Sequence, residues 1–338
     1  MKCKHMVIPV FIPHRGCPFD CIYCNQKKIS GRIQEINPAE MRLLIESYTK
    51  SAPENSYIEI GFYGGSFTGI EKEDQIKFLQ IAKDYIDDGS IKGVRLSTRP
   101  DYISEKILEY LKQYRVSTIE LGVQSLDNDV LQKSCRGHTA QVVYYASELI
   151  KEWGFSLGIQ TMIGLPGDSC EKAIYTAKEV TGISPDIVRI YPALVIRDTY
   201  LEEMYKQGKY IPLALNEAVE TCAVLLDIYR NNNINVIRIG LQPTENINES
   251  ADVVAGPFHP AFRQLVESKL ALNKIEDAIL YKGLHRKSDL VIGTDKRKIS
   301  NVVGQRRSNI NYLKEKYKYN SVTVKLCEDG HEICDVKY

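Results

Sequence analysis

This 338-residue sequence lacks several features that mark common protein classes. It contains no run of eighteen apolar residues, so we expect no helix that crosses a membrane. Two lysines precede an apolar stretch near the start, but Pro9, Pro13 and the absence of a small-residue cleavage site argue against a signal peptide. We therefore expect a cytoplasmic protein in a reducing compartment.

A fourth cysteine is missing from the most conspicuous motif. Cys17, Cys21 and Cys24 form a C-x3-C-x2-C triplet directly after the apolar run 7–12, and the next cysteine, Cys135, stands alone more than a hundred residues later. The odd total of nine cysteines and the lack of a secretory signal argue against disulfides. Structural zinc usually takes a second pair of ligands. The triplet therefore favours three corners of an iron–sulfur cluster, which normally has four thiolates, while zinc or chance clustering stays open.

Acidic residues are scarce between Lys282 and Lys318, where eleven Lys and Arg stand against three Asp and Glu. The whole chain carries a net charge of only +1, so the remainder is acidic. Such asymmetry indicates an anionic partner, although a solvated basic face would give the same count. Basic residues interleaved with tyrosines suit single-stranded or looped RNA, but no named RNA-binding module is visible. These residues are Arg286, Lys287, Lys296, Arg297, Lys298, Arg306, Arg307, Tyr312, Tyr317 and Tyr319.

From residue 38 onward, short apolar runs alternate with stretches of helical period. The apolar runs predict strands at 7–12, 57–64, 93–98, 116–123, 155–164 and 186–195. Alternating βα units predict a parallel sheet with helices packed against it. The pattern alone does not separate a six-stranded open barrel from a doubly wound sheet.

The end of the chain has a different character. We expect a last strand at 236–245 and a helix from about 261 to 281. The stretch 322–338 alternates and carries Asp329-Gly330, which predicts a hairpin. Cys327, His331 and Cys334 flank that turn, either as packing residues or as a metal trio.

Unusual residues follow the predicted strands, where the chemistry of a parallel α/β fold is located. A glycine-rich turn at 64–69 follows the second strand, and it is not a phosphate loop because no Gly-Lys-Ser/Thr follows. An ordinary tight turn, or hydrogen bonds that satisfy the strand ends, would explain these residues as well. The candidates are Gly64, Gly65, Ser66, Ser97, Gln124, Arg136, Gln160 and Ala193.

The cysteine triplet, with Tyr23 before its last member, resembles the signature of the radical S-adenosylmethionine (SAM) superfamily. The segments GVQS (122–125), KSCRGHT (133–139) and GIQTMIGLPGDS (158–169) resemble oxygen-independent coproporphyrinogen oxidases and the catalytic subunit of Elongator. RIYPALVIRDTYLEEMYKQGKYIPLALNEAVE (189–220) closely resembles the segment after strand six of the Elongator subunit. The resemblance covers about the first 240 residues.

The resemblance implies an α/β fold, a partial (β/α)6 barrel over residues 1–245 with a small basic α+β extension over 246–338. It implies that Cys17, Cys21 and Cys24 hold a [4Fe-4S] cluster whose fourth iron is chelated by S-adenosyl-L-methionine. One-electron reduction, from a donor such as a ferredoxin or flavodoxin, would cleave SAM to a 5′-deoxyadenosyl radical that abstracts hydrogen from the substrate. The residues that would contact SAM are Gly64, Gly65, Ser66, Ser97, Gln124, Arg136, Gln160 and Ala193.

The resemblance and the basic segment together favour tRNA or another RNA as the substrate, so that the enzyme would modify a nucleoside. The Elongator subunit continues into an acyltransferase domain, whereas fewer than a hundred residues follow Gly240 here, without a convincing acyl-CoA loop. Acetyl-CoA is therefore not carried over from the resemblance. A radical SAM enzyme that acts on a small molecule, and a non-catalytic RNA-binding protein with a structural metal, are the alternatives.

Overall fold

A computed structural model describes residues 5–12, 21–25, 36–241, 252–327 and 335–337 of the chain. Its main sheet has seven parallel strands in the order β1-β2-β3-β4-β5-β6-β8. All six predicted βα units and the predicted last strand are present. The strands are β1 (His5–Phe11), β2 (Tyr57–Tyr63), β3 (Gly93–Thr98), β4 (Val116–Gln124), β5 (Ser156–Ile163), β6 (Ile187–Pro192) and β8 (Asn235–Ile239).

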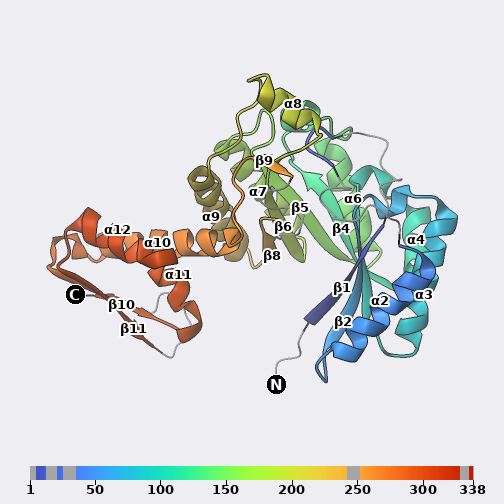
Figure 1. Cartoon of the computed structure of the whole chain (residues 1–338), viewed down its shortest axis with the longest axis horizontal. Coiled ribbons are helices and arrows are strands. Elements are labelled where there is room, and N and C mark those ends of the chain that lie inside the picture. The colour runs from blue at the N-terminus through green and yellow to red at the C-terminus, as the bar shows by residue number, and fades with distance from the viewer. Residues whose placement is uncertain (1–4, 13–20, 26–35, 242–251, 328–334, 338) are drawn as a thin grey trace.

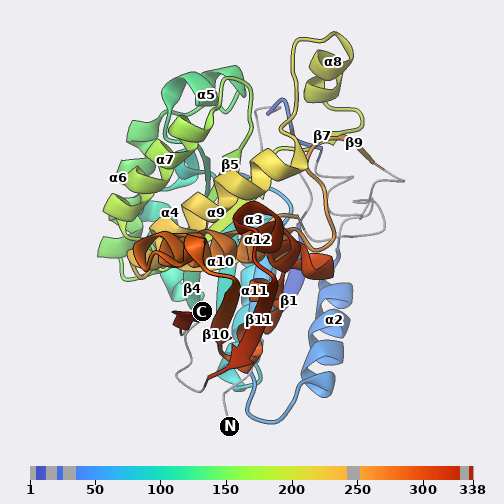
Figure 2. The same ribbon diagram turned by 90° about the vertical axis from the view of Figure 1, so that its left-hand side faces the viewer.

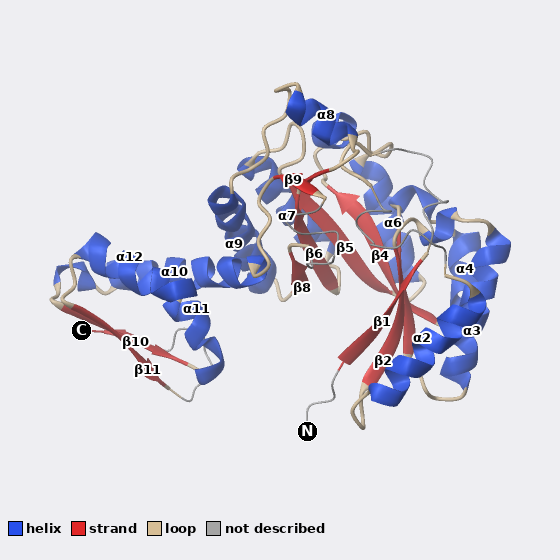
Figure 3. Cartoon of the chain, in the orientation of Figure 1, coloured by secondary structure: helices blue, strands red, loops and turns tan. Residues whose placement is uncertain are grey.

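Helices cover the outer face of this sheet, which curves into the half-barrel seen in Figures 1 and 3. Because successive side chains of a strand point to opposite faces, Ile58, Ile60 and Phe62 of β2 pack into the core beneath the helices, while Glu59 and Tyr63 face the concave side. The predicted barrel fold is confirmed. The covering helices are α2 (Pro38–Ser51), α3 (Lys72–Asp87), α4 (Glu105–Gln113), α6 (Ala140–Glu152), α7 (Cys170–Ile183) and α9 (Leu215–Asn231).

Short elements gather beyond the carboxyl ends of the strands. The strand β7 (Val195–Ile196) follows β6 directly, and it pairs with β9 (Val253–Ala255) in an antiparallel ribbon. The helix α8 (Tyr200–Lys206) comes next in the chain and caps this end of the barrel (Figure 1). The remaining short elements here are η1 (Phe67–Gly69), η2 (Pro100–Tyr102) and α5 (Asn128–Lys133).

The helix α10 (Phe262–Tyr281) joins the half-barrel to a second group of elements, which we call the C-terminal lobe (residues 271–327 and 335–337). At 1.5 Å per residue, its 20 residues span about 30 Å. Its first half packs in the barrel core through Phe262 and Val266, and its second half packs in a separate core through Ile275 and Ile279. The predicted helix at about 261–281 is therefore confirmed, and the predicted domain boundary after residue 245 stays a prediction.

The lobe contains a three-stranded sheet in the order β11-β10-β12, formed by β11 (Ser321–Leu326), β10 (Asp289–Thr294) and β12 (Asp335–Lys337). The hairpin predicted at 322–338 is wrong, because β10 lies between the two strands and pairs with both. Alternation within the tail identifies two strands but not their partner, and β10 offers a more apolar one, with Leu290 and Ile292 fully buried. The helices α11 (Ile299–Val303) and α12 (Ser308–Tyr317) complete the lobe, which Figure 2 shows from its own side.

No helix among the described residues is long and apolar enough to cross a membrane.

Candidate active site

The described part of the cysteine loop is a turn fixed to the mouth of the barrel. The N–H of Cys24 donates to the carbonyl of Cys21 at 2.9 Å. The N–H of Ile22 donates to the carbonyl of Ser134 at 3.4 Å, and the carbonyl of Ile22 accepts from the N–H of Leu201 at 2.8 Å. These bonds connect the turn to the segment after β4 and to α8. Cys17, the first cysteine of the triplet, lies outside the described residues.

Arg136 is the residue that links the cysteine turn to β4. Its guanidinium is buried, and Nη1 donates to Sγ of Cys21 at 3.3 Å while Nη2 donates to the carbonyl of Gly122. A guanidinium carries a permanent positive charge and several N–H donors in a fixed plane. It therefore places both positive charge and a hydrogen-bond donor against a sulfur that the sequence predicts to be a metal ligand.

The end of β4 is shaped to admit two side chains that the sequence predicted. A Cβ atom on Gly122 would lie 2.9 Å from Nη2 of Arg136 and 3.2 Å from Nε2 of Gln124, so glycine lets both side chains approach the strand without being displaced. The pairing register shifts between Gly122 and Gln124, and Gln124 has a left-handed φ of +70°. Such a conformation is uncommon outside glycine and is worth a functional explanation. Here it keeps Gln124 beside Arg136 at the mouth.

A buried arginine that the sequence analysis did not select, Arg99, connects the loops after β2, β3 and β4. Its N–H donates to Oγ of Ser66 at 3.0 Å, and its Nη2 donates to the carbonyl of Arg136 at 2.7 Å. The same guanidinium makes two 2.9 Å hydrogen bonds to Asp101. The predicted residues Ser66 and Arg136 are thus held by one residue, Ser66 by the backbone N–H of Arg99 and Arg136 by its guanidinium. The feature of the sequence that could have identified Arg99 is its position directly after a predicted strand, at 93–98.

The glycine-rich turn after β2 approaches β1 closely. Gly64 has a φ of +105°, and a Cβ atom there would lie 2.8 Å from the carbonyl of Ile12. Both observations require glycine. Gly65 follows directly in the same turn, which lies against the end of β1.

The three remaining predicted residues fall in two places. Nε2 of Gln160 donates to Oγ of Ser97 at 3.1 Å and to Oε2 of Glu120 at 3.2 Å, so these side chains from β3, β4 and β5 meet on the concave face. Ala193 is buried in a small cluster against which the ring of Tyr23 packs. Ala193 thus borders the cysteine turn, whereas Ser97 and Gln160 belong to a polar network across the strands.

That network contains four charged residues which sequence reasoning missed. They alternate in sign across β2, β3, β4 and β6 as Glu59, Arg95, Glu120 and Arg189, and all are buried or nearly so. Arg95 Nε donates to Glu59 at 3.0 Å, and its Nη1 donates to Glu120 at 3.4 Å. Arg189 makes two hydrogen bonds to Glu120, at 2.6 and 3.0 Å. These residues could have been identified from the sequence, because each is the single charged residue within its strand.

Electrostatics fix the protonation of this network. Burial alone would lower the pKa of Arg189, but the adjacent carboxylate of Glu120 raises it above its ordinary value. Burial, and then the charge of Glu120, raise the pKa of Tyr63 to about 12, and Arg189 donates to its hydroxyl oxygen at 3.3 Å. The concave face therefore carries two guanidiniums, of Arg95 and Arg189, whose raised pKa values keep them charged at neutral pH.

Two further titratable groups lie near the mouth. Burial, and then the charge of Arg136, lower the pKa of His138 to about 4, so this imidazole is neutral at pH 7. Its Nε2 atom is buried without a hydrogen-bond partner among the described residues. Burial raises the pKa of Asp168 to about 6, although its carboxylate accepts the N–H of Gly164 at 2.7 Å.

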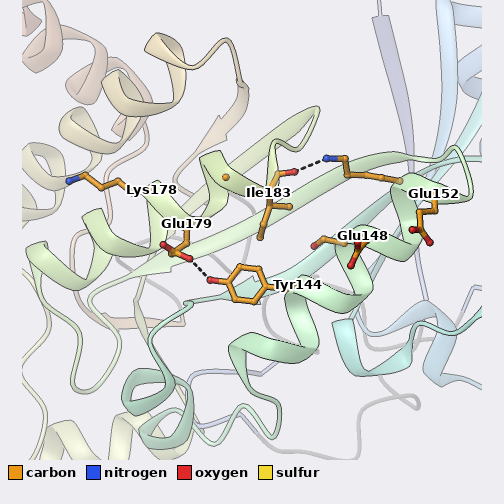
Figure 4. Close-up of a pocket in the computed structure, with 9 residues that line it drawn as sticks. Tyr144, Glu148, Glu152, Lys178, Glu179 and Ile183 are labelled. Carbon is orange, nitrogen blue, oxygen red and sulfur yellow. Dashed lines mark hydrogen bonds between the residues drawn. The ribbon is translucent and has the colours of Figure 1, made fainter.

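A surface hollow of about 590 Å³ lies elsewhere, between α6 and α7 (Figure 4). Tyr144 donates to Glu179 at 2.5 Å within it, and Lys151 donates to the carbonyl of Ile183 at 2.8 Å. These residues come from the outer helices. The hollow contains none of the residues predicted from the sequence, so it is not the candidate site.

The described residues fit a thiolate-bound cluster with a ligand beside it. Cys21 and Cys24 lie in one turn, Arg136 donates to Cys21, and the buried Tyr23 hydroxyl lies beside the Cys21 thiol without the geometry of a hydrogen bond to it or to another described group. No group of three or more His, Cys, Asp or Glu side chains in the described ranges could hold a metal ion, and Cys17 is outside them. His331 and Cys334, of the second cysteine group, also lie outside the described residues.

Comparison with known families identifies this architecture. Residues 11–180 match the model of the radical SAM superfamily, and residues 185–271 match the model of the radical SAM C-terminal domain. The first match covers half of the chain, and together they cover the barrel from the end of β1 onward and the first half of α10.

Relatives at 30% identity or more include tRNA uridine(34) acetyltransferases and Elongator complex proteins. A tRNA uridine(34) acetyltransferase of Methanocaldococcus infernus is 32% identical over 254 residues, which cover 64% of this chain and 47% of the relative. Human Elongator complex protein 3 is 35% identical over 137 residues, 40% of this chain and 25% of that protein. The chain thus spans about half the length, or less, of these curated relatives.

A solved structure shows the same relationship. The archaeal Methanocaldococcus infernus Elp3 with an N-terminal deletion aligns with a TM-score of 0.63 and 26% identity, covering 84% of this chain and 64% of that one. The predicted resemblance to the Elongator catalytic subunit is confirmed.

Proposed function

This chain belongs to the radical SAM superfamily, and we propose that it is a radical SAM enzyme that modifies RNA, with tRNA as its substrate. Members of the superfamily bind a [4Fe-4S] cluster and S-adenosyl-L-methionine. The observation that supports an active site at the barrel mouth is the hydrogen-bond chain from Ser66 through Arg99 and Arg136 to Cys21. It ties the loops after four consecutive strands around the cysteine turn.

Cys21 and Cys24, with Cys17, would hold the cluster. When bound, cluster and SAM supply a reductive cleavage that gives a 5′-deoxyadenosyl radical for hydrogen abstraction. Arg136 orients the Cys21 sulfur and places positive charge beside it. Gln124, held next to Arg136 by the turn at Gly122, is positioned to meet the polar end of SAM.

The other predicted contacts belong to the same proposal. The backbone of Gly64, Gly65 and Ser66 would contact SAM. Gly64 lies against the end of β1, and Ala193 belongs to the buried cluster that Tyr23 packs against. Glu120 orients the amide of Gln160, because its carboxylate can only accept and the NH2 group must face it. The same NH2 group donates to Oγ of Ser97. The chain's task is orientation and exclusion of side reactions, while the cofactors supply the chemistry.

The proposal of a tRNA substrate is supported by relatives named tRNA uridine(34) acetyltransferase, which match 58–64% of this chain. Because the chain spans about half of the tRNA uridine(34) acetyltransferase, the proposal includes the radical step on an RNA and does not include acetyl transfer. A small iron–sulfur or flavin protein, such as a ferredoxin or flavodoxin, would supply the electron. The basic C-terminal segment would contact the RNA.

Anaerobic reconstitution tests the enzyme. The purified chain should bind about four iron atoms and release 5′-deoxyadenosine from SAM in the presence of dithionite. Stoichiometric zinc without 5′-deoxyadenosine would contradict the proposal. Mass spectrometry of tRNA nucleosides from cells with and without the gene then tests the substrate. An unchanged nucleoside profile, with 5′-deoxyadenosine formed only when a small metabolite is added, would replace RNA by a small molecule.

A further inference from the structure

The C-terminal lobe has an arrangement of elements that suggests its own function. From β10 the chain passes through α11, a tight turn and α12, and it returns as β11 parallel to β10. The helices α10, α11 and α12 lie on one face of the sheet (Figures 1 and 2), and they share a core with Leu290, Ile292 and Val322. A pair of short helices joined by a tight turn, packed on a small sheet, is similar to the KH module, in which a Gly-X-X-Gly turn clamps the nucleic-acid backbone.

The turn between the two helices reads Gly304-Gln305-Arg306-Arg307. Gly304 has a φ of +76°, and a Cβ atom there would lie 2.4 Å from Oγ of Ser308 and 2.9 Å from the backbone N of Asn309. Glycine is therefore required at the first position. The fourth position carries Arg307 instead of glycine, yet its φ of +63° is the left-handed conformation that glycine adopts most easily.

Asn309 holds this turn in place. Its buried side-chain amide donates to the carbonyls of Asn301 at 3.1 Å and Val302 at 3.3 Å in α11, and to the carbonyl of Ser268 at 2.9 Å in α10. One amide thus satisfies carbonyl groups at the end of α11 and fastens the turn to α10. The turn is consequently fastened to both α10 and α11 by hydrogen bonds.

The two arginines of the turn are exposed and unneutralised. Neither Arg306 nor Arg307 has an ion-pair partner in the part of the chain that the structure describes, whereas Arg297 pairs with Asp295 and Lys316 pairs with Glu276. Arg306 also adopts a left-handed φ, of +52°. Left-handed backbone costs a side-chain-bearing residue about 1 kcal/mol, so the turn keeps two arginines where glycine would be more stable.

These features of the turn favour the binding of a phosphate group. A guanidinium offers a planar fork that matches a phosphate. The ten-residue helix α12 begins directly after the turn, and no side chain caps its first N–H groups. Two exposed guanidiniums at an uncapped helix start in a region of excess positive charge fit the backbone of a polyanion. The parallel to the KH turn selects single-stranded RNA among polyanions.

We propose that the turn from Gly304 to Ser308 clamps the sugar–phosphate backbone of a single-stranded RNA segment, and that the C-terminal lobe is a KH-like RNA-binding module of this enzyme. The proposal rests on the proposed function only in taking RNA as the substrate class. It assigns the contact to two residues among the eleven basic ones between Lys282 and Lys318.

The test uses the full chain with its cluster reconstituted and a fluorescein-labelled oligouridine of about ten nucleotides. Fluorescence anisotropy gives the Kd over a series of KCl concentrations. The double variant R306G/R307G keeps a backbone compatible with positive φ, so it should fold at least as stably as the wild type. Its affinity should fall by on the order of ten- to thirtyfold near 0.1 M salt, and its salt slope should decrease by about 1.4, because each lost phosphate contact on a single strand accounts for about 0.7.

Two matched variants control for net charge. R306E/R307E should weaken RNA binding further, and K106E/K178E, which makes the same charge change on the exposed surfaces of α4 and α7, should keep the wild-type salt slope. A wild-type slope in R306G/R307G, or an equal loss in K106E/K178E, would overturn the clamp. Displacement of the oligouridine by polyglutamate as effectively as by unlabelled RNA would also overturn it, in favour of an acidic protein partner.

Failure of the clamp and failure of the proposed function give different results. Formation of 5′-deoxyadenosine without RNA should be the same in the wild type and in R306G/R307G, because the turn is not part of the barrel mouth. If the wild type makes no 5′-deoxyadenosine, the radical chemistry is wrong whatever the RNA titration shows. If it does, and R306G/R307G keeps the wild-type RNA salt slope, only the clamp is wrong.

Discussion

The half-barrel and the C-terminal lobe use arginine in opposite ways. In the barrel, Arg95 and Arg189 are buried against Glu59 and Glu120, and the four charges cancel. In the lobe, the turn arginines are exposed, and the described residues offer them no carboxylate. Neutralised charge inside a sheet fixes the positions of strand side chains around a site. Unneutralised charge on a surface attracts a polyanion that arrives from solution.

The cysteine turn should give the largest effect of any single substitution. Replacing Cys21 or Cys24 by Ala removes a predicted cluster ligand, so iron content should fall severely and 5′-deoxyadenosine formation should drop by at least about a hundredfold. Iron analysis and chromatography of the products measure both. Cys170→Ser, at an exposed position on α7, should keep both values. Full iron content in the Cys21→Ala protein would assign the cluster elsewhere.

The contrast between buried and exposed charge predicts very different stability effects. Glu120→Ala leaves Arg95 and Arg189 buried without their shared carboxylate, so the free energy of unfolding should fall by about 3–5 kcal/mol. Arg306→Ala in the lobe should change it by less than about 1 kcal/mol. Urea unfolding of the two variants and the wild type provides the measurement. Similar losses in both variants would show that the barrel charges are not coupled as described.

The pH dependence of stability should separate two groups at the mouth, because their pKa values move in opposite senses. The pKa of His138 is lowered by burial to about 4, so its contribution to stability is present above pH 6.5 and is lost on acidification. Between pH 7 and pH 5 this loss should be about 2 kcal/mol, and His138→Gln should abolish it. Urea unfolding at the two pH values measures the difference.

Asp168 should show the reverse. Burial raises its pKa to about 6, so its contribution is present below pH 3.8 and is lost as pH rises through 6. Asp168→Asn should therefore be more stable than the wild type at pH 7, and the advantage should shrink by about 1 kcal/mol at pH 5. A variant less stable at pH 7 than at pH 5, relative to the wild type, would contradict this sign.

A further prediction concerns the support of the turn. Asn309→Ala removes an amide that satisfies three carbonyls, so the lobe should lose about 1–2 kcal/mol. The affinity of the variant for RNA should fall because the turn is no longer held in place. Its iron content and its cleavage of SAM without RNA should stay at the wild-type level. Asn311→Ala, an exposed neighbour on α12, is the matched control. An equal effect of both substitutions would remove the special role of Asn309.

Much of the barrel could be predicted from the sequence, because βα alternation and the cysteine triplet are local patterns. Contacts between distant residues could not. Nothing in the alternation of 322–338 reveals that β10 separates β11 from β12, and nothing local reveals that Arg99 bridges Ser66 and Arg136. Likewise, Gly304-Gln305-Arg306-Arg307 lacks the second glycine of a KH turn, and only the left-handed φ of Arg307 exposes the similarity.

We propose radical chemistry at the barrel mouth and RNA binding by the C-terminal lobe, and one measurement tests both. The rate of 5′-deoxyadenosine formation by the reconstituted enzyme is followed as bulk tRNA is titrated. We predict that tRNA changes the rate saturably in the wild type, and that R306G/R307G keeps the RNA-free rate but needs at least about tenfold more tRNA for the same change. Identical titration curves for the two proteins, or no response of the wild type to tRNA, would contradict the account.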